Sequence, residues 1–224
     1  MKQNVLCLHP APREFPSGLA VAATGTTAAS SVQPHSIMVA NSHERPVVLR
    51  PFQMADARPM YQAARESLGQ LRTWMTWCRP DYSLADAEAF VADCEAAWEK
   101  GAHYSFAIVE KDTDAMLGSI GLNQINLAHR CGNVGYWIRD SAVGRGVATT
   151  ASRLVARFAL QELGLSRLEF LIAAGNIASQ RVAQKAGARF EGLLRNRLRL
   201  NGSFHDAALY ALVAGDFSSL TVLI

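Results

Sequence analysis

A short glycine-rich turn carries the clearest chemical signal in the sequence. It reads Val143-Gly144-Arg145-Gly146-Val147-Ala148-Thr149 and stands between a predicted strand and a predicted helix. Glycines let the backbone turn sharply and leave no side chains in the way of a ligand. The first amides of a helix have no partner inside the helix, and with the helix dipole they attract anions. The turn therefore predicts a diphosphate site, although on its own it is equally typical of an ordinary loop.

The spacing of this turn also disfavours two well-known phosphate sites. It does not read G-x-x-x-x-G-K-[ST], which is the pattern of an ATPase P-loop, nor G-x-G-x-x-G, which is the pattern of a Rossmann dinucleotide site.

A second polar pair lies at the start of a predicted helix over residues 176–187. Asn176 and Ser179 are three residues apart, so they share one helix face. Taken alone, the pair is more typical of an N-cap followed by a polar residue of the first turn.

Three side chains near the C-terminus are weak candidates for a general base. They are Glu191, His205 and Asp206, acting directly or through water, and each also suits an exposed turn or strand. Cys131 is not expected to be a nucleophile, because no histidine or basic residue stands near it in the sequence.

Arginines and tryptophans form two further patterns. Arg195, Arg197 and Arg199 alternate along a predicted strand and should share one face, which is either solvated or a basic rim for an acidic acceptor protein or for nearby ribosomal RNA. Trp74 and Trp77 have helical spacing, which is more typical of a core than of an acceptor pocket.

The elements that must position these residues follow from periodicity, caps and turns. A mixed order of strands and helices is expected, with a hairpin at Asn201-Gly202. The sequence predicts strands over 47–51, 104–109, 116–125, 131–138 and 168–172, and two final strands around 201–202. It predicts helices over 56–78, 83–101, 146–162 and 176–187. The strand–helix–strand passage over 131–173 predicts one parallel pair in a mixed, mainly antiparallel sheet, and so an α/β fold.

Composition sets broad limits on the protein. Its 224 residues, half of them hydrophobic, suffice for one packed domain, and a net charge of +3 argues against a dedicated nucleic-acid binder. The four cysteines show no metal-ligand spacing, so free thiols and no metal are expected. The chain has no apolar run of roughly 18 residues and a poor secretory signal, which predicts a cytoplasmic protein without a membrane partner.

The N-terminal region differs from the rest of the chain. Residues 1–44 are rich in Pro, Ala, Ser and Thr without a sustained period, and they predict a disordered extension before a domain over 45–217 and a tail over 218–224. The alternatives are an upstream start codon, with Met38 as the true first residue, or a docked regulatory arm.

The conjunction of these segments resembles the GNAT superfamily of N-acetyltransferases, in particular its RimJ/RimL branch. The resemblance covers roughly residues 46–216, and each motif is loose while their order and spacing are specific. The motifs are the glycine turn at Val143–Ala148, an N-x-x-S helix at Asn176–Ala188, Gly135-Tyr136-Trp137-Ile138, Phe190-Glu191-Gly192, the early Leu71-x-x-Trp74-x-x-Trp77, and a hairpin with Asn201, Gly202, Asp206 and Tyr210.

The resemblance implies a GNAT fold, with a sheet splayed where the donor enters, and acetyl-CoA as the acetyl donor. It implies direct attack of an amine on the thioester, a backbone amide at Trp137–Ile138 that polarises the thioester oxygen, and Ser179 as the catalytic group at the leaving thiolate. The residues that it assigns to acetyl-CoA binding are Trp137, Ile138, Val143, Gly144, Arg145, Gly146, Val147, Ala148, Thr149, Asn176 and Ser179.

Two positions depart from the family pattern. Val143 replaces a glutamine or arginine that would contact the phosphates, and Leu198 stands where some members carry a glutamate proposed as the general base. The resemblance favours the N-terminal amine of a ribosomal or other protein as acceptor, and a monomer or homodimer. The alternatives are a small amine such as an antibiotic, amino acid or polyamine, a non-catalytic acyl-CoA sensor, and a nucleotide-binding regulator.

Overall fold

The computed structural model describes residues 38–40 and 46–218. Most of the predicted extension and tail therefore lies outside the described residues, as does Cys7. Its elements, in chain order, are β1 (Met38–Ala40), β2 (Val47–Pro51), η1 (Met54–Asp56), α1 (Ala57–Glu66), α2 (Leu68–Trp74), α3 (Leu84–Lys100), β3 (Tyr104–Glu110), β4 (Met116–Asn126), β5 (Cys131–Ile138), η2 (Asp140–Ala142), α4 (Val147–Arg157), η3 (Phe158–Glu162), β6 (Arg167–Ala173), α5 (Ile177–Ala186), β7 (Arg189–Leu200), β8 (Ser203–Val213) and α6 (Ala214–Ser218).

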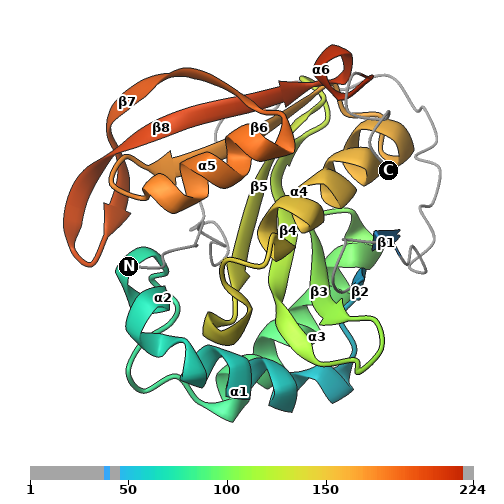
Figure 1. The fold of residues 1–224 in the computed structure, drawn as a ribbon, viewed down its shortest axis with the longest axis vertical. Helices are drawn as coiled ribbons and strands as arrows, with labels where there is room; N and C mark the ends of the chain where they lie inside the picture. The colour runs from blue at the N-terminus through green and yellow to red at the C-terminus, as the bar shows by residue number, and fades with distance from the viewer. Residues whose placement is uncertain (1–37, 41–45, 219–224) are drawn as a thin grey trace, which may run out of the picture.

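One twisted sheet runs through the molecule in the order β1-β2-β3-β4-β5-β6-β8-β7 (Figure 1). Among the described strands, β5 and β6 are the one parallel pair, and every other neighbouring pair is antiparallel. The predicted mixed, mainly antiparallel α/β fold is confirmed. Its first strand, Met38–Ala40, belongs to the sheet although these residues fall within the predicted extension.

The parallel pair is short, and the sheet opens beyond it. Only Cys131, Gly132 and Asn133 of β5 pair with β6, at Arg167 to Glu169, whereas β5 continues to Ile138 and β6 to Ala173. Figure 1 shows the two strands diverging below this point. The predicted splay of the sheet is therefore present, and it leaves backbone groups of both strands without a ladder partner.

Asn133 stands at the fork of the splay. Its Nδ2 donates to Asn123 Oδ1 at 3.0 Å, and its Oδ1 accepts the Leu171 N–H at 3.4 Å. The side chain thus takes the place of the next ladder bond at the point where the strands separate.

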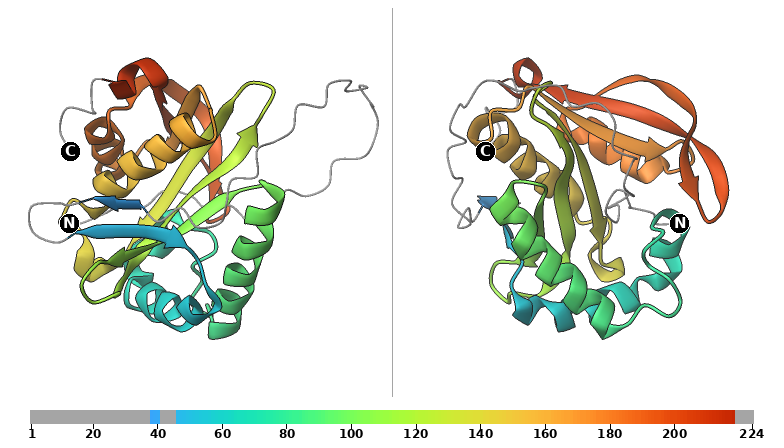
Figure 2. Two further views of the ribbon diagram at one scale, coloured as in Figure 1. Left: turned by 90° about the vertical axis from the view of Figure 1, so that its right-hand side faces the viewer. Right: turned by 180° about the vertical axis from the view of Figure 1, so that it is seen from behind.

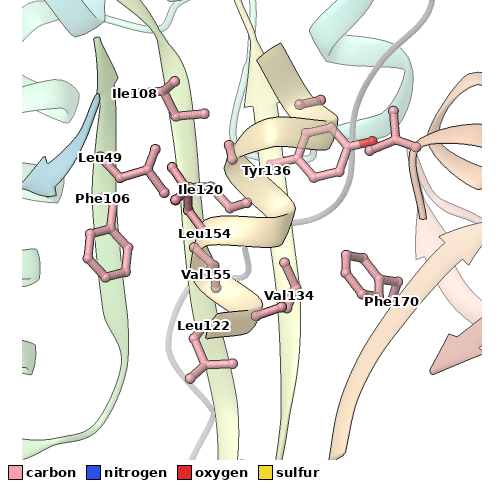
Figure 3. Close-up of a cluster of buried hydrophobic side chains, with 14 of the residues drawn as sticks. Leu49, Phe106, Ile108, Ile120, Leu122, Val134, Tyr136, Leu154, Val155 and Phe170 are labelled. Carbon is pink, nitrogen blue, oxygen red and sulfur yellow. The ribbon is translucent and has the colours of Figure 1, made fainter. Parts of the chain in front are cut away.

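Helices cover both faces of the sheet, with α4 and α5 on one and α1, α2 and α3 on the other (Figure 2). Figure 3 shows Leu154 and Val155 of α4 among side chains of β2 to β6. A second apolar cluster joins α1, α2 and α3 to the opposite face, where Trp137 of β5 is fully buried. The two cores hold β5, the strand that borders the splay, from both sides.

The predicted helix over 56–78 is wrong in two respects, because it ends at Trp74 and not at Cys78, and because it is broken at Ser67. The backbone there leaves helical geometry at φ −98° and ψ 5°, and α1 ends before α2 begins. The Ser67 hydroxyl donates to Ala63 O at 2.7 Å and accepts the Asp140 N–H at 2.9 Å. The break lets α1 and α2 hold the segment that leads from β5 to the glycine turn.

The other predicted boundaries follow their caps. Ser83 Oγ accepts the Asp86 N–H at 3.2 Å at the start of α3, and Gly101 ends that helix at φ 61°. Asn201 and Gly202, at φ 49° and 86°, have the two positive φ values that a tight hairpin requires. The helix predicted over 146–162 is present as α4 followed by η3, and only the π-helical geometry of η3 was not predicted.

Candidate functional site

The glycine turn projects into open space at the start of α4. Gly144 and Gly146 adopt φ 84° and 78°, and a Cβ built on either would meet no atom within 4 Å. Gly146 is the N-cap residue of α4, and no side chain caps the helix. The predicted helix start without a side-chain cap is therefore present in the structure, and a helix start of this kind suits a diphosphate.

Side chains of the turn face away from this open space. Val143, Val147 and Ala148 are buried in the core, so only their backbones are available to a ligand. Arg145 Nη2 lies 3.0 Å from Glu110 Oε1 at the end of β3. The burial explains how valine is accommodated at position 143, because an apolar side chain there anchors the turn.

Arg139 and Glu66 fix the approach to the turn. Arg139 Nε donates to Glu66 Oε2 at 2.7 Å, and the Ser141 N–H donates to Glu66 Oε1 at 3.3 Å. The Arg139 guanidinium beside Glu66 lowers the pKa of that carboxyl. These contacts tie the residues between β5 and the turn to α1.

Backbone polarity along β5 identifies which amides face the splay. The Arg139 N–H donates to Leu117 O of the β4 segment at 2.8 Å. In an antiparallel ladder the backbone groups of alternate residues point to the same side, so those of Trp137 point to β4 and those of Tyr136 and Ile138 point away from it. The Ile138 carbonyl oxygen accepts from Gln70 Nε2 of α2 at 3.5 Å, which agrees with a backbone that points away from β4. Of the predicted pair Trp137–Ile138, it is Ile138 whose amide faces the splay.

The start of α5 holds the second predicted pair. Asn176 Oδ1 accepts the Ser179 N–H at 3.1 Å, so the N-cap interpretation is confirmed, and both residues are buried. Burial raises the pKa of Tyr136, and the neighbouring Ser179 side chain opposes that rise. Tyr136 on β5 and Ser179 on α5 therefore meet across the splay. Sequence reasoning gave Tyr136 no role beyond its motif.

A cavity of about 390 Å³ lies between α2 and the β7–β8 hairpin. Figure 1 shows the hairpin tip reaching down beside α2, where Asn201 Nδ2 donates to Arg72 O at 3.2 Å. The walls come from α2, from the end of β6 with the residues before α5, and from the hairpin: Thr73, Trp74, Ala173, Ala174, Gly175, Leu200, Asn201, Ser203, His205 and Asp206. The cavity thus borders β6, one of the two strands of the splay.

The two tryptophans of α2 and the following turn have separate positions. Trp74 lines the cavity, whereas Trp77 packs in the core with its ring centroid 5.9 Å from that of Trp137. Both tryptophans pack against the core, as their helical spacing predicted, and Trp74 also lines the cavity.

The candidate general bases are also separated. Glu191 pairs with Arg167, whose Nη1 lies 2.9 Å from Oε1, and this hydrogen bond lowers the pKa of Glu191. His205 and Asp206 line the cavity. Leu198 is buried in an apolar cluster, so no carboxylate occupies the position where some relatives of this branch carry one.

Other predicted features are settled by exposure and register. Cys78, Cys94 and Cys131 are free thiols, and burial raises the pKa of Cys78 to about 11 and that of Cys94 to about 12.

Arg195, Arg197 and Arg199 are exposed on the edge strand β7. The prediction that they share one face is not sustained, because the register shifts between Leu194 and Leu198 and Asn196 has φ 51°.

Within the described chain, no helix is both long and apolar enough to cross a membrane. No group of three potential metal ligands occurs among the same residues.

Comparisons with known proteins give this arrangement a family. A family model described as "Acetyltransferase (GNAT) domain" matches residues 47–189. The chain is 26% identical to the ribosomal-protein-serine acetyltransferase of Escherichia coli over 156 residues, which are 70% of this chain and 86% of that protein. It is also 26% identical to the spermidine N(1)-acetyltransferase of Escherichia coli over 164 residues, 72% of this chain and 82% of the relative.

A solved structure shows the same fold. RimJ of Mycobacterium smegmatis, in complex with CoA-disulfide, superposes with a TM-score of 0.77 at 24% identity, covering 84% of this chain and 94% of that one. The match over 47–189 includes the splay, the glycine turn and the start of α5. The chain belongs to the GNAT acetyltransferase family, and it is an enzyme that uses acetyl-CoA as its acetyl donor.

Proposed function

We propose that the protein acetylates the N-terminal α-amine of a protein, by direct attack of the amine on acetyl-CoA in a ternary complex. The observation that carries the proposal is the early end of β5–β6 pairing, which opens the sheet between two features. The uncapped start of α4 follows β5 in sequence, and the cavity beside α2 borders β6. A donor and an acceptor can thus enter from different elements and meet at the opening.

The donor is proposed to be held mainly by the backbone. The amides at Gly146–Thr149 bind the diphosphate, and Gly144 and Gly146 leave room for it. Val143, Val147 and Ala148 contribute through the backbone because their side chains are buried. Arg145 reinforces the positive field of the turn, although its guanidinium is shared with Glu110.

The remaining donor contacts lie along the splay. The Ile138 amide, directed away from β4, is the proposed hydrogen-bond donor to the thioester oxygen, and Trp137 fixes that strand by its burial. Asn176 holds the pantetheine arm or a bound water. Ser179 is the proposed catalytic residue that donates to the leaving thiolate, and Tyr136 positions its hydroxyl.

An α-amine suits this chemistry. Its ordinary pKa is near 8, so a useful fraction is neutral near pH 7 and needs alignment more than activation. The cavity is open between α2 and the hairpin, which allows an extended N-terminus to enter. A ribosomal-protein-serine acetyltransferase among the relatives supports this acceptor class.

A thiol-release assay with acetyl-CoA tests the acceptor. We expect release of CoA with peptides that carry a free N-terminus and none with the same peptides blocked at the N-terminus. The blocked peptides contain lysine, so they also show whether the enzyme acetylates a side-chain amine when the α-amine is absent. Equal rates with free and blocked peptides would contradict an α-amine acceptor, and no release with any amine would remove the proposed reaction.

A second candidate acceptor is a small polyamine. The relative that acetylates spermidine matches as well in identity as the ribosomal-protein enzyme does. Spermidine therefore belongs in the same panel, and a kcat/KM for spermidine at least tenfold above that of every peptide would select this alternative.

A further inference from the structure

The transfer of an acetyl group to an amine requires a group that accepts a proton from the nitrogen. The resemblance to the RimJ/RimL branch implies a glutamate, proposed as general base in some members, at the position of Leu198. Leu198 is 7% exposed and packs with Ala173, Leu200 and Ala207. The proposed function thus leaves the proton acceptor unassigned.

Two of the three candidates face other partners. Glu191 is held by Arg167, and the pairing stabilises its charged form. Asp206 Oδ1 accepts the Asn196 N–H at 2.9 Å at the irregular part of the hairpin. Asp206 also contributes to the wall of the cavity. In the alternation along β8, however, it lies on the same side as Tyr210, whose hydroxyl donates to Gln180 Oε1 of α5, so the Asp206 side chain belongs to the sheet face toward α5.

His205 belongs to the opposite face. Residues two apart on a strand point to the same face of the sheet, so His205 lies on the same face as Ala207 and on the opposite face from Asp206. Ala207 belongs to the apolar cluster that includes Leu198, and Trp74 packs against this cluster. Its side chain is exposed, and it lines the cavity beside α2. Among the described residues, the imidazole has no recorded hydrogen bond or ion pair.

The register of the hairpin places His205 directly across from the missing carboxylate. Leu198 of β7 and His205 of β8 are cross-strand partners. Directly opposed residues of an antiparallel pair project to the same face with Cβ atoms about 5 Å apart. The imidazole of His205 on β8 can therefore reach the same space that a glutamate at position 198 of β7 would reach.

We propose that His205 is the general base of this enzyme. The proposal rests on the acetyl transfer proposed above. The amine nitrogen forms its bond to the thioester carbon as the carbon–sulfur bond breaks, and the neutral imidazole takes the proton that the nitrogen loses. The thiolate takes a proton from Ser179, which regains one from solvent, or takes it from solvent directly, and His205 returns its proton to solvent. The products are the acetylated amine and free CoA.

His205→Gln and His205→Ala test the assignment, with His129→Ala as the matched control because His129 is an exposed histidine in a turn. With the acceptor that the wild type acetylates fastest, we expect kcat of both His205 variants to fall about 100-fold. The Kd for CoA and the melting temperature should stay at wild-type values. Added imidazole should restore part of the turnover of His205→Ala and leave the wild type and His129→Ala unchanged.

A relocated base makes the test more specific. In the double variant Leu198→Glu/His205→Ala, a carboxylate returns to the opposite strand, and we expect turnover at least tenfold above that of His205→Ala alone. If the buried glutamate lowers the melting temperature below the assay range, the imidazole experiment decides alone.

The outcomes separate the two proposals. Wild-type turnover in His205→Ala, or a 100-fold loss that imidazole does not relieve, overturns the assignment of His205 while acetyl transfer stands. Absence of wild-type turnover with every amine overturns the acetyl transfer itself.

Discussion

Gly146 is the residue at which charge and backbone geometry act together. Its φ of 78° puts it in the region that favours glycine, and the space around a Cβ there is empty. Any other L-residue would add about 1–2 kcal/mol of backbone strain. The electrostatic effect of a substitution can therefore be separated from strain by comparing two substitutions of opposite charge.

We expect Gly146→Glu to abolish acetyl-CoA binding, because its carboxylate would lie among the amides that bind the diphosphate. Gly146→Lys carries the same strain with the opposite charge and should retain binding within about tenfold of the wild type. Isothermal titration with CoA measures both. Equal losses in the two variants would mean that strain, and not charge, sets the affinity.

Ser179 and Tyr136 form the buried polar pair across the splay. Ser179→Ala should lower kcat about 100-fold with little change in the Kd for CoA, because the hydroxyl is proposed to stabilise the leaving thiolate only as the bond breaks. Tyr136→Phe keeps the Ser179 hydroxyl but removes its neighbour, so a smaller loss is expected. Steady-state kinetics with titrated CoA gives both quantities, and unaltered kcat in Ser179→Ala would remove that residue from the mechanism.

At the scale of elements, α5 is a helix whose cap and whose proposed ligand contact come from the same residue. Asn176 Oδ1 accepts the Ser179 N–H, and Asn176 is also proposed to hold the pantetheine arm. The two roles use different atoms of the side chain, since capping needs only an acceptor oxygen.

We expect Asn176→Ala to reduce the free energy of unfolding by about 1 kcal/mol, because the cap is lost. Asn176→Asp keeps an acceptor at the cap and should unfold at the wild-type denaturant concentration. If the amide holds the donor, both variants bind CoA more weakly, and Asn176→Asp then loses affinity without losing stability. Chemical denaturation and CoA titration on the two variants separate the roles; wild-type affinity in Asn176→Asp would leave only the cap.

The break between α1 and α2 is a second case in which an element serves the site. Glu66 and Ser67 contact Arg139, Asp140 and Ser141, which lead into the glycine turn. A continuous helix would carry these groups past that segment. The kink thus connects α2, which lines the cavity of the proposed acceptor, to the segment that leads into the proposed donor site.

At the scale of the whole molecule, the sheet extends to Met38. Met38 is 3% exposed and belongs to the main core, and Met38–Ala40 pair with Val47–Leu49. Full burial of a methionine side chain contributes about 1.5–3 kcal/mol. We therefore propose that the folded domain begins before β1 and not at residue 45.

Two truncations test this boundary. We expect removal of residues 1–37 to leave the melting temperature nearly unchanged, and removal of residues 1–44 to lower it by several degrees because β1 and the Met38 side chain are lost. Thermal unfolding followed by circular dichroism compares the two. An equal melting temperature for both truncations would mean that β1 adds nothing to the fold.

Local chemistry made much of this protein predictable from its sequence. The caps at Ser83, Gly101 and Asn176, the Asn201-Gly202 hairpin and the glycine turn all depend on residues within a few positions of each other, so their conformations could be inferred from residue type. The acetyl donor and the family followed from the order of these local signals along the chain.

Only the tertiary structure decided which distant residues share a space. It joined Tyr136 to Ser179, directed the Ile138 amide toward the splay, and set His205 opposite Leu198 on the wall of the cavity. Sequence reasoning treated Glu191, His205 and Asp206 as equivalent, because strand parity, register and the bulge between Leu194 and Leu198 depend on pairing with other strands. Residue type limits what a side chain can do, and long-range packing determines what it meets.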